Sequence, residues 1–111
     1  MKALTTRVGS YRTGDAVADA VLSYSLALAR AEKLDIVELP FRSPNGDIAR
    51  VQLRVGWMVD IDVVSQRYRE SELTDPGMVA DLQGRHDALH PNGNAPLVAE
   101  DLISIDGLGE Y

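Results

Sequence analysis

The feature that most limits how this chain can fold is a long alternation between Ala49 and Val64. Apolar residues occupy its odd positions, and mainly charged, polar or small residues occupy its even ones. Side chains of a β-strand point to two faces in turn, so the alternation predicts extended chain with one dry face and one wet face. The run spans sixteen residues with Gly56 near its middle, whereas a usual strand has about 5–6 residues. We therefore expect a break at Gly56.

Two arrangements agree with such a break. In the preferred one, Gly56, Trp57 and Met58 form the loop of a hairpin that places Leu53 opposite Ile61 and Arg54 opposite Asp60. In the other, residues 49–64 form one long strand that is kinked at Gly56. The three-residue loop keeps the apolar side chains of the hairpin on one face, whereas a two-residue loop would place Leu53 opposite Asp60.

A second strand precedes this run. Asp35–Arg42 has apolar residues at its odd positions, and Ser43–Asp47 reads Ser-Pro-Asn-Gly-Asp, a strong turn signal. A hairpin that pairs Phe41 with Ala49, Leu39 with Val51 and Val37 with Leu53 keeps both apolar sets on one side. A slip of one residue would separate them, so the pattern predicts the register.

The clearest helical pattern runs from Arg12 to Leu34. Its apolar residues follow helical steps of three and four, at Val17, Val21, Tyr24, Leu28 and Ala31. Thr13 is the expected N-cap. Leu22 and Leu26 form a second apolar stripe, which predicts a partner surface or a docked segment.

Weaker patterns lie at the two ends. Lys2–Tyr11 predicts a first strand. Thr74–His90 predicts a second helix, with Thr74 or Asp75 as its cap and Pro76 in its first turn. The residues expected to face inward from it are Val79, Leu82, His86 and Leu89.

The predicted fold is a small α+β domain over residues 1–91. Its three- or four-stranded, mainly antiparallel sheet has the chain order β-α-β-β-β-α, and one long amphipathic helix packs on one face. A length of 111 residues fits a single core. Residues 92–111 are expected to form an acidic tail that is docked or binds a partner.

Charge is unevenly distributed along the chain. The net charge is −6. Residues 1–71 hold ten Lys/Arg and nine Asp/Glu, whereas the residues from Glu72 onward hold one Lys/Arg and eight Asp/Glu. Nucleic-acid binding draws most of its affinity from clustered positive charge, so we expect no nucleic-acid partner. Helix, three strands and helix is also the order of the double-stranded RNA-binding domain. The matching second helix here begins Thr74–Asp81 without a lysine or arginine, so the resemblance assigns no activity.

Composition also indicates where in the cell the protein is expected. The absence of cysteine excludes disulfides and thiolate sites. The first residues lack a signal-peptide pattern, and no apolar run approaches the roughly 18 residues of a membrane span. We expect a cytoplasmic protein without a membrane segment. The nine arginines against two lysines favour a bacterial origin.

Candidate functional residues are few. His86 and His90 lie four apart on a predicted helix with Asp87 between them, which is a possible metal pair, although histidines also suit a helix C-terminus. Asp60 and Asp62 are a possible carboxylate pair or simply the wet side of the sheet. Arg42, Arg50 and Arg54 share the charged face and are candidate anion ligands. Trp57 is either a contact residue or a cap over the core.

These patterns favour a non-catalytic binding or assembly protein that needs no cofactor. We expect a homodimer, formed through Leu22 and Leu26, an edge strand or the acidic tail. The alternatives are metal-dependent hydrolysis at His86 and His90, and a nucleic-acid or anion-binding module on the Arg42/Arg50/Arg54 face.

Overall fold

The computed structural model describes residues 1–67 and 71–89 and has an α+β architecture. In chain order, its elements are β1 (Lys2–Thr5), β2 (Ser10–Thr13), α1 (Asp15–Arg30), β3 (Leu34–Arg42), β4 (Ile48–Gly56), β5 (Asp62–Ser65) and α2 (Pro76–Ala88). The antiparallel sheet has the strand order β4-β3-β2-β1-β5. The predicted class is thus confirmed, but the strand count and order are not. Both predicted helices are present, but the description of one long helix packed on the sheet is not confirmed.

The predicted first strand is in fact a hairpin. β1 pairs with β2, and Leu4 lies opposite Tyr11. Between them the backbone amide of Thr6 donates to the Gly9 carbonyl oxygen at 2.7 Å, and the amide of Val8 donates to the Thr6 hydroxyl at 3.2 Å. These two bonds close a turn inside what the sequence pattern presents as one alternating stretch.

The β3–β4 hairpin has the register that the alternation predicts. Val37 lies opposite Leu53, Leu39 opposite Val51 and Phe41 opposite Ala49. Leu39 and Val55 are fully buried, so the odd-numbered face is the dry one, as expected.

The break at Gly56 is confirmed, but neither predicted arrangement follows it. Gly56 has a φ of +115°, and the backbone amide of Trp57 donates to the Lys33 carbonyl oxygen at 2.9 Å, which turns the chain away from β4. β5 then pairs with β1, at the opposite edge of the sheet, with Val63 opposite Leu4. Arg54 and Asp60 are therefore not cross-strand neighbours, and β4 is an edge strand.

Helix α1 is shorter than predicted, and its N-cap is Gly14 rather than Thr13. The Thr13 hydroxyl instead donates to the Pro40 carbonyl oxygen at 2.7 Å in a buried position. The Glu72 carboxylate accepts a hydrogen bond from the Asp15 backbone amide at 2.5 Å. A side chain remote in the sequence thus satisfies a free backbone amide at the start of α1, where no local side chain caps the helix.

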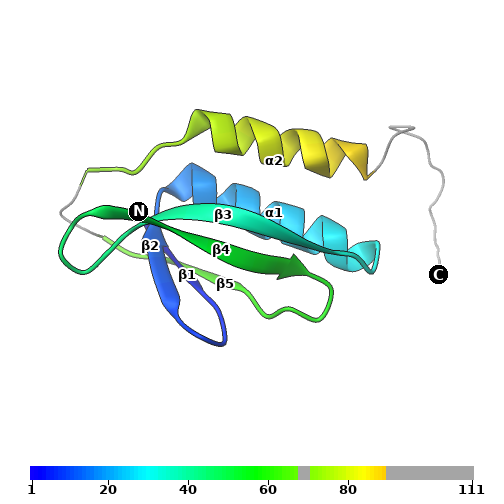
Figure 1. Cartoon of the computed structure of the whole chain (residues 1–111), viewed down its shortest axis with the longest axis horizontal. Helices are drawn as coiled ribbons and strands as arrows, with labels where there is room; N and C mark the ends of the chain where they lie inside the picture. The colour runs from blue at the N-terminus through cyan, green and yellow to red at the C-terminus, as the bar shows by residue number, and fades with distance from the viewer. Residues whose placement is uncertain (68–70, 90–111) are drawn as a thin grey trace.

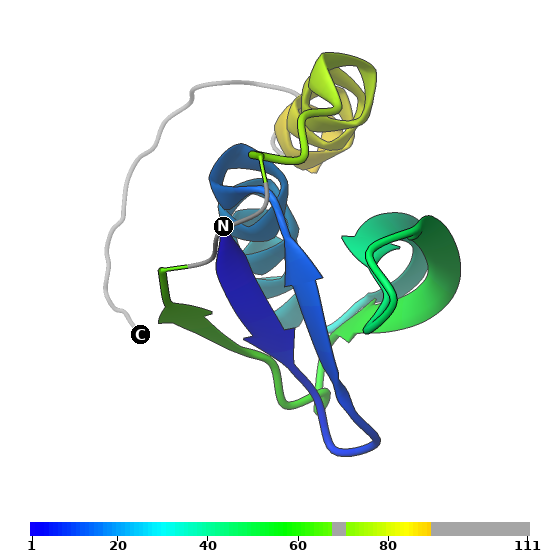
Figure 2. The same cartoon turned by 90° about the vertical axis from the view of Figure 1, so that its left-hand side faces the viewer.

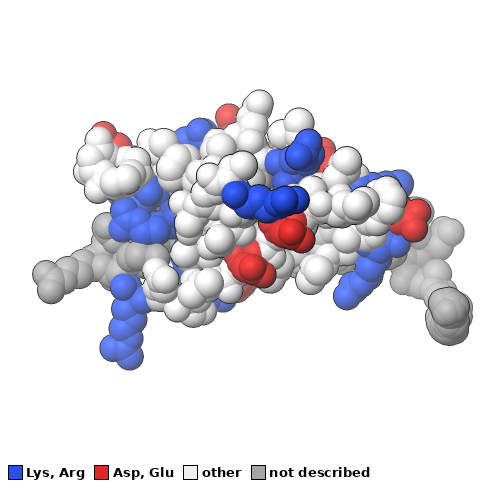
Figure 3. Space-filling model, turned by 90° about the horizontal axis from the view of Figure 1, so that it is seen from below, with Lys and Arg blue, Asp and Glu red and all other residues white. Residues whose placement is uncertain are grey.

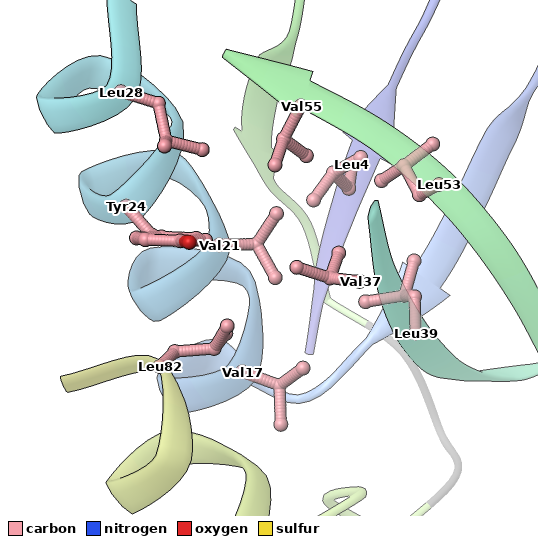
Figure 4. Close-up of a cluster of buried hydrophobic side chains, with 10 residues drawn as sticks. All are labelled: Leu4, Val17, Val21, Tyr24, Leu28, Val37, Leu39, Leu53, Val55 and Leu82. Atoms are coloured by element: carbon pink, nitrogen blue, oxygen red, sulfur yellow. The ribbon is translucent and has the colours of Figure 1, made fainter. Parts of the chain in front are cut away.

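The core lies between α1 and the dry face of the sheet (Figure 4). It comprises Leu4, Val17, Val21, Tyr24, Leu28, Val37, Leu39, Leu53, Val55 and Leu82. Leu82 comes from α2, which packs along α1 (Figures 1 and 2). The second helix is confirmed, with Asp75 as its N-cap and Pro76 at its start. Neither described helix is long and apolar enough to cross a membrane.

The two hairpins diverge from each other. β2 and β3 are paired only at Arg12 and Arg42, and the β1–β2 hairpin points away beneath β3 and β4 (Figures 1 and 2). This divergence leaves most of the β2 and β3 edges unpaired with each other, and it positions the surfaces described below. The predicted tail, residues 92–111, lies outside the described part of the chain.

Candidate functional site

The outer face of the β3–β4 hairpin brings together the three candidate anion ligands. Arg42 lies opposite Ile48, Arg50 opposite Pro40 and Arg54 opposite Ile36, so all three side chains start from the even-numbered face. The alternation that buries the odd positions therefore places the three arginines on one face of the hairpin, and their role as anion ligands stays a prediction.

Exposed aliphatic side chains share this face with the arginines. Leu34, Ile36 and Ile48 keep 55%, 58% and 57% of their surface exposed. A wet sheet face usually carries polar residues at such positions, so three large aliphatic side chains on one hairpin face are unusual. We call the surface formed by Leu34, Ile36, Ile48, Arg42, Arg50 and Arg54 the arginine–aliphatic face.

The arginines form a row rather than a cluster. Arg42 donates to the Gly46 carbonyl oxygen at 3.1 Å and to the Ser71 hydroxyl at 3.3 Å, which fixes it over the turn. Arg50 lies 4.0 Å from carboxylate oxygens of both Glu38 and Asp75. Four residues along a strand span about 13 Å, which separates the Cα atoms of Arg50 and Arg54. The row therefore suits an extended acidic surface better than one small anion.

Trp57 follows β4 directly and lies in the loop between β4 and β5. Its side chain is 45% exposed. Its backbone amide is held by Lys33, the residue before Leu34, so Trp57 stands beside the end of the arginine–aliphatic face where β3 begins. This position agrees with a contact residue, and the predicted interface role of Trp57 stays a prediction.

The predicted stripe on α1 lies next to α2. Leu22 is partly buried and Leu26 is 49% exposed. Both line an open groove of about 440 Å³ together with Asp19, Ser23, Arg30 and His86. The second helix thus covers part of the apolar surplus that the sequence shows on α1, and the predicted interface role of Leu22 and Leu26 stays a prediction.

The structure describes only one histidine of the predicted metal pair, His86. His86 lies in the last turn of α2, where its Nδ1 is 3.6 Å from a carboxylate oxygen of Asp87. His90 lies outside the described residues. Within residues 1–67 and 71–89, no group of three or more His, Cys, Asp or Glu side chains is placed to hold a metal ion. The metal pair remains a prediction.

A polar junction ties α1, β3 and α2 together. The Tyr24 hydroxyl donates to the Asp35 carboxylate at 2.5 Å, and Arg85 donates to the same oxygen at 3.2 Å. Burial, reinforced by the bond to Asp35, raises the pKa of Tyr24 to about 12. The bond from Tyr24 is the largest cause of the lowered pKa of Asp35. The second partner of Arg85 is Asp81, at 3.0 Å. These contacts connect the three elements, so we interpret the junction as structural.

Comparison with known proteins gives no indication of function. No family model matches the sequence, and neither the curated proteins nor the solved structures give a match.

Side chains of both charges lie on the side that Figure 3 shows. That side is the underside of the molecule in Figure 1, where the β1–β2 hairpin lies, and its basic and acidic side chains are interspersed among uncharged ones. Nucleic-acid binding draws on gathered positive charge, and the expected absence of a nucleic-acid partner stays a prediction.

The sequence did not predict that the β1–β2 turn lies beside β4. Residues Thr6–Val8, in the β1–β2 turn, line a cavity with β4 and with the loop after it. Arg54 and Asp60, expected as cross-strand partners, both line this cavity instead. The alternation could not reveal it, because the cavity depends on the angle between two hairpins that are far apart in sequence.

Proposed function

We propose that this chain is a non-catalytic assembly protein that forms a homodimer. In this dimer, the arginine–aliphatic face of each copy binds the acidic C-terminal third of the other. The observation that carries the proposal is the exposure of Leu34, Ile36 and Ile48 beside Arg50 and Arg54 on one hairpin face.

The composition of the face supports a protein partner. Interfaces are enriched in arginine, whose aliphatic stem packs on apolar surface while its guanidinium pairs with carboxylates. Burying three half-exposed aliphatic side chains would release water from surface that the monomer leaves wet. Each such side chain contributes up to about 1.5 kcal/mol, half of the gain from full burial.

Charge complementarity supports a second copy as the partner. The residues from Glu72 onward hold eight Asp/Glu and one Lys/Arg, a net charge of −7. Part of that charge is displayed on α2, where Asp81 and Asp87 are 56% and 69% exposed. In a twofold dimer the contact occurs twice, so a weak single contact is doubled.

Sedimentation velocity of the full chain over a range of concentration and salt tests this proposal. We expect a dimer at low salt that weakens as salt rises, because exposed charges are screened beyond a Debye length of about 8–10 Å. The double variant Arg50→Glu/Arg54→Glu should be monomeric. Arg30→Glu, an exposed arginine at the end of α1, is the matched control and should dimerise like the original chain.

Two results would refute the proposal. One is a monomer at every concentration up to about 1 mM, which would leave the contact too weak to matter. The other is a dimer that the double variant does not weaken, which would place the interface elsewhere, for instance at the groove that Leu22 and Leu26 line.

A further inference from the structure

The cavity beneath β4 is a second candidate site, and Arg54 is the one residue that it shares with the arginine–aliphatic face. It has a volume of about 300 Å³ and lies where the β1–β2 turn, the edge strand β4 and the β4–β5 loop meet. Figure 2 shows the β1–β2 hairpin reaching beneath β3 and β4. The lining comes from three segments: Thr6, Arg7, Val8 and Tyr11; Val51, Gln52, Leu53 and Arg54; and Met58, Val59 and Asp60.

The apolar part of the lining is continuous with the core. Leu53 belongs to the core, and Tyr11 and Val51 pack against it. Val59 adds a further partly buried apolar side chain. A ligand here would therefore meet rigid, packed side chains rather than loose surface, and its apolar part would be removed from water.

The rim carries the charge. Arg7, Arg54 and Asp60 are all exposed, which gives the rim one net positive charge. Val8 and Met58, exposed by 87% and 82%, extend apolar surface outward from the cavity. Such an arrangement matches a molecule with an apolar body and a single anionic head.

We propose that this cavity binds a small amphipathic carboxylate, with its short hydrocarbon body against Tyr11, Val51 and Leu53 and its carboxylate at Arg7 and Arg54. The volume lies at the lower end of ligand pockets, about 300–1,000 Å³, which favours a short chain over a long lipid. Guanidinium groups at the mouth bind a carboxylate through charge-assisted hydrogen bonds, and these also fix which end of the ligand faces solvent.

Octanoate is the probe for this proposal, and 1-octanol is its uncharged match. Each would be titrated into the isotopically labelled full chain while the methyl signals of Val51, Leu53 and Val59 are followed by nuclear magnetic resonance. We expect saturable shifts at these residues, with octanoate binding roughly 3- to 10-fold more tightly than octanol because two exposed ion pairs each add a modest factor.

Arginine variants separate the head group from the body. Arg7→Gln should weaken octanoate several-fold and leave octanol unchanged, whereas Arg30→Gln on α1 should change neither. Arg7 and Arg30 are both exposed, and an unchanged melting temperature verifies that each variant is folded. Arg7 lies in the β1–β2 turn and outside the arginine–aliphatic face, so its substitution tests the cavity without changing a residue of the proposed dimer contact.

Four results would overturn the proposal. No saturation by about 10 mM octanoate would mean that the cavity is only the margin of the core. Equal affinity for octanol, or no effect of Arg7→Gln, would contradict an anionic ligand. Shifts centred on Leu22 and Leu26 would move the site to the groove between the helices.

Discussion

At the scale of single residues, Gly56 is where the chain leaves β4, and only glycine fits there. Its φ is +115°, and a Cβ atom would lie 2.3 Å from the Lys33 carbonyl oxygen and 3.0 Å from the Leu28 Cβ. We expect Gly56→Ala to lower the free energy of unfolding by more than about 3 kcal/mol, since both the positive φ and the clash oppose it. Urea denaturation measures this loss.

Gly46 provides the matched control for that substitution. Its φ is +92°, but a Cβ there would meet nothing within 4 Å. Gly46→Ala should therefore cost only the backbone strain, about 1–2 kcal/mol. Equal losses in the two variants would mean that the contact with Lys33 does not constrain the chain.

Glu32 is a site where the natural residue is not the most stable one. It has a φ of 55° just after the end of α1, where its amide donates to the Ala29 carbonyl oxygen and the Lys33 amide donates to that of Leu28. This is the Schellman arrangement, in which glycine is favoured. We expect Glu32→Gly to raise the free energy of unfolding by about 1 kcal/mol. Glu32→Ala keeps the strain and should change stability little; a thermal melt of both variants separates strain from charge.

At the scale of elements, the junction of Tyr24, Asp35 and Arg85 joins α1, β3 and α2, and its contribution depends on pH. Tyr24→Phe removes a hydrogen bond to a carboxylate, so we expect a loss of about 1.5–3 kcal/mol in the free energy of unfolding near neutral pH. Urea denaturation of both chains across pH measures this difference.

The pKa shifts give the sign of the pH dependence. The pKa of Asp35 is lowered in the fold, so its contribution is present above the ordinary 3.8 and is lost as pH falls through the folded value. The pKa of Tyr24 is raised from 10.0 to about 12, so its contribution is present below 10.0 and is lost as pH rises toward 12. The difference between the chain and Tyr24→Phe should be largest between about pH 5 and 9 and shrink on both sides. A constant difference would show that the bond is not ionic in character.

How far the elements could be predicted depends on how local their causes are. The register of β3 with β4 follows from parity, because a slip would wet Val37 and Leu53. The Asp75 cap and Pro76 are likewise local signals. The prediction of Thr13 as N-cap was wrong, because two contacts of the tertiary fold replace the local one. The Thr13 hydroxyl donates to the Pro40 carbonyl oxygen, and Glu72 accepts the hydrogen bond from the Asp15 amide. The three arginines were visible as even positions of the sheet. The exposed aliphatic side chains beside them were not predicted, and the cavity at Arg7 required the geometry of the two hairpins.

At the scale of the whole molecule, the pairing of β5 is the feature that the sequence left undetermined. The alternating residues 59–63 fit either β4 or β1, since both neighbours present an apolar face. The fold places Asp62 opposite Thr5 of β1. In the hairpin preferred from the sequence, Asp62 would instead lie opposite Gln52 of β4.

Paired cysteines distinguish these two topologies, and the chain contains no cysteine to interfere. Directly opposed residues in antiparallel strands have Cα atoms about 4.5–5.5 Å apart, which a disulfide spans. We expect Thr5→Cys/Asp62→Cys to form an intramolecular disulfide on mild oxidation, seen as a mobility shift that reductant reverses. Closing a loop of this size should raise the free energy of unfolding by up to about 4 kcal/mol. Gln52→Cys/Asp62→Cys should remain reduced under the same conditions, because β4 and β5 lie at opposite edges of the sheet. If the second pair closed and the first did not, β5 would belong beside β4, and the cavity beneath β4 would not exist.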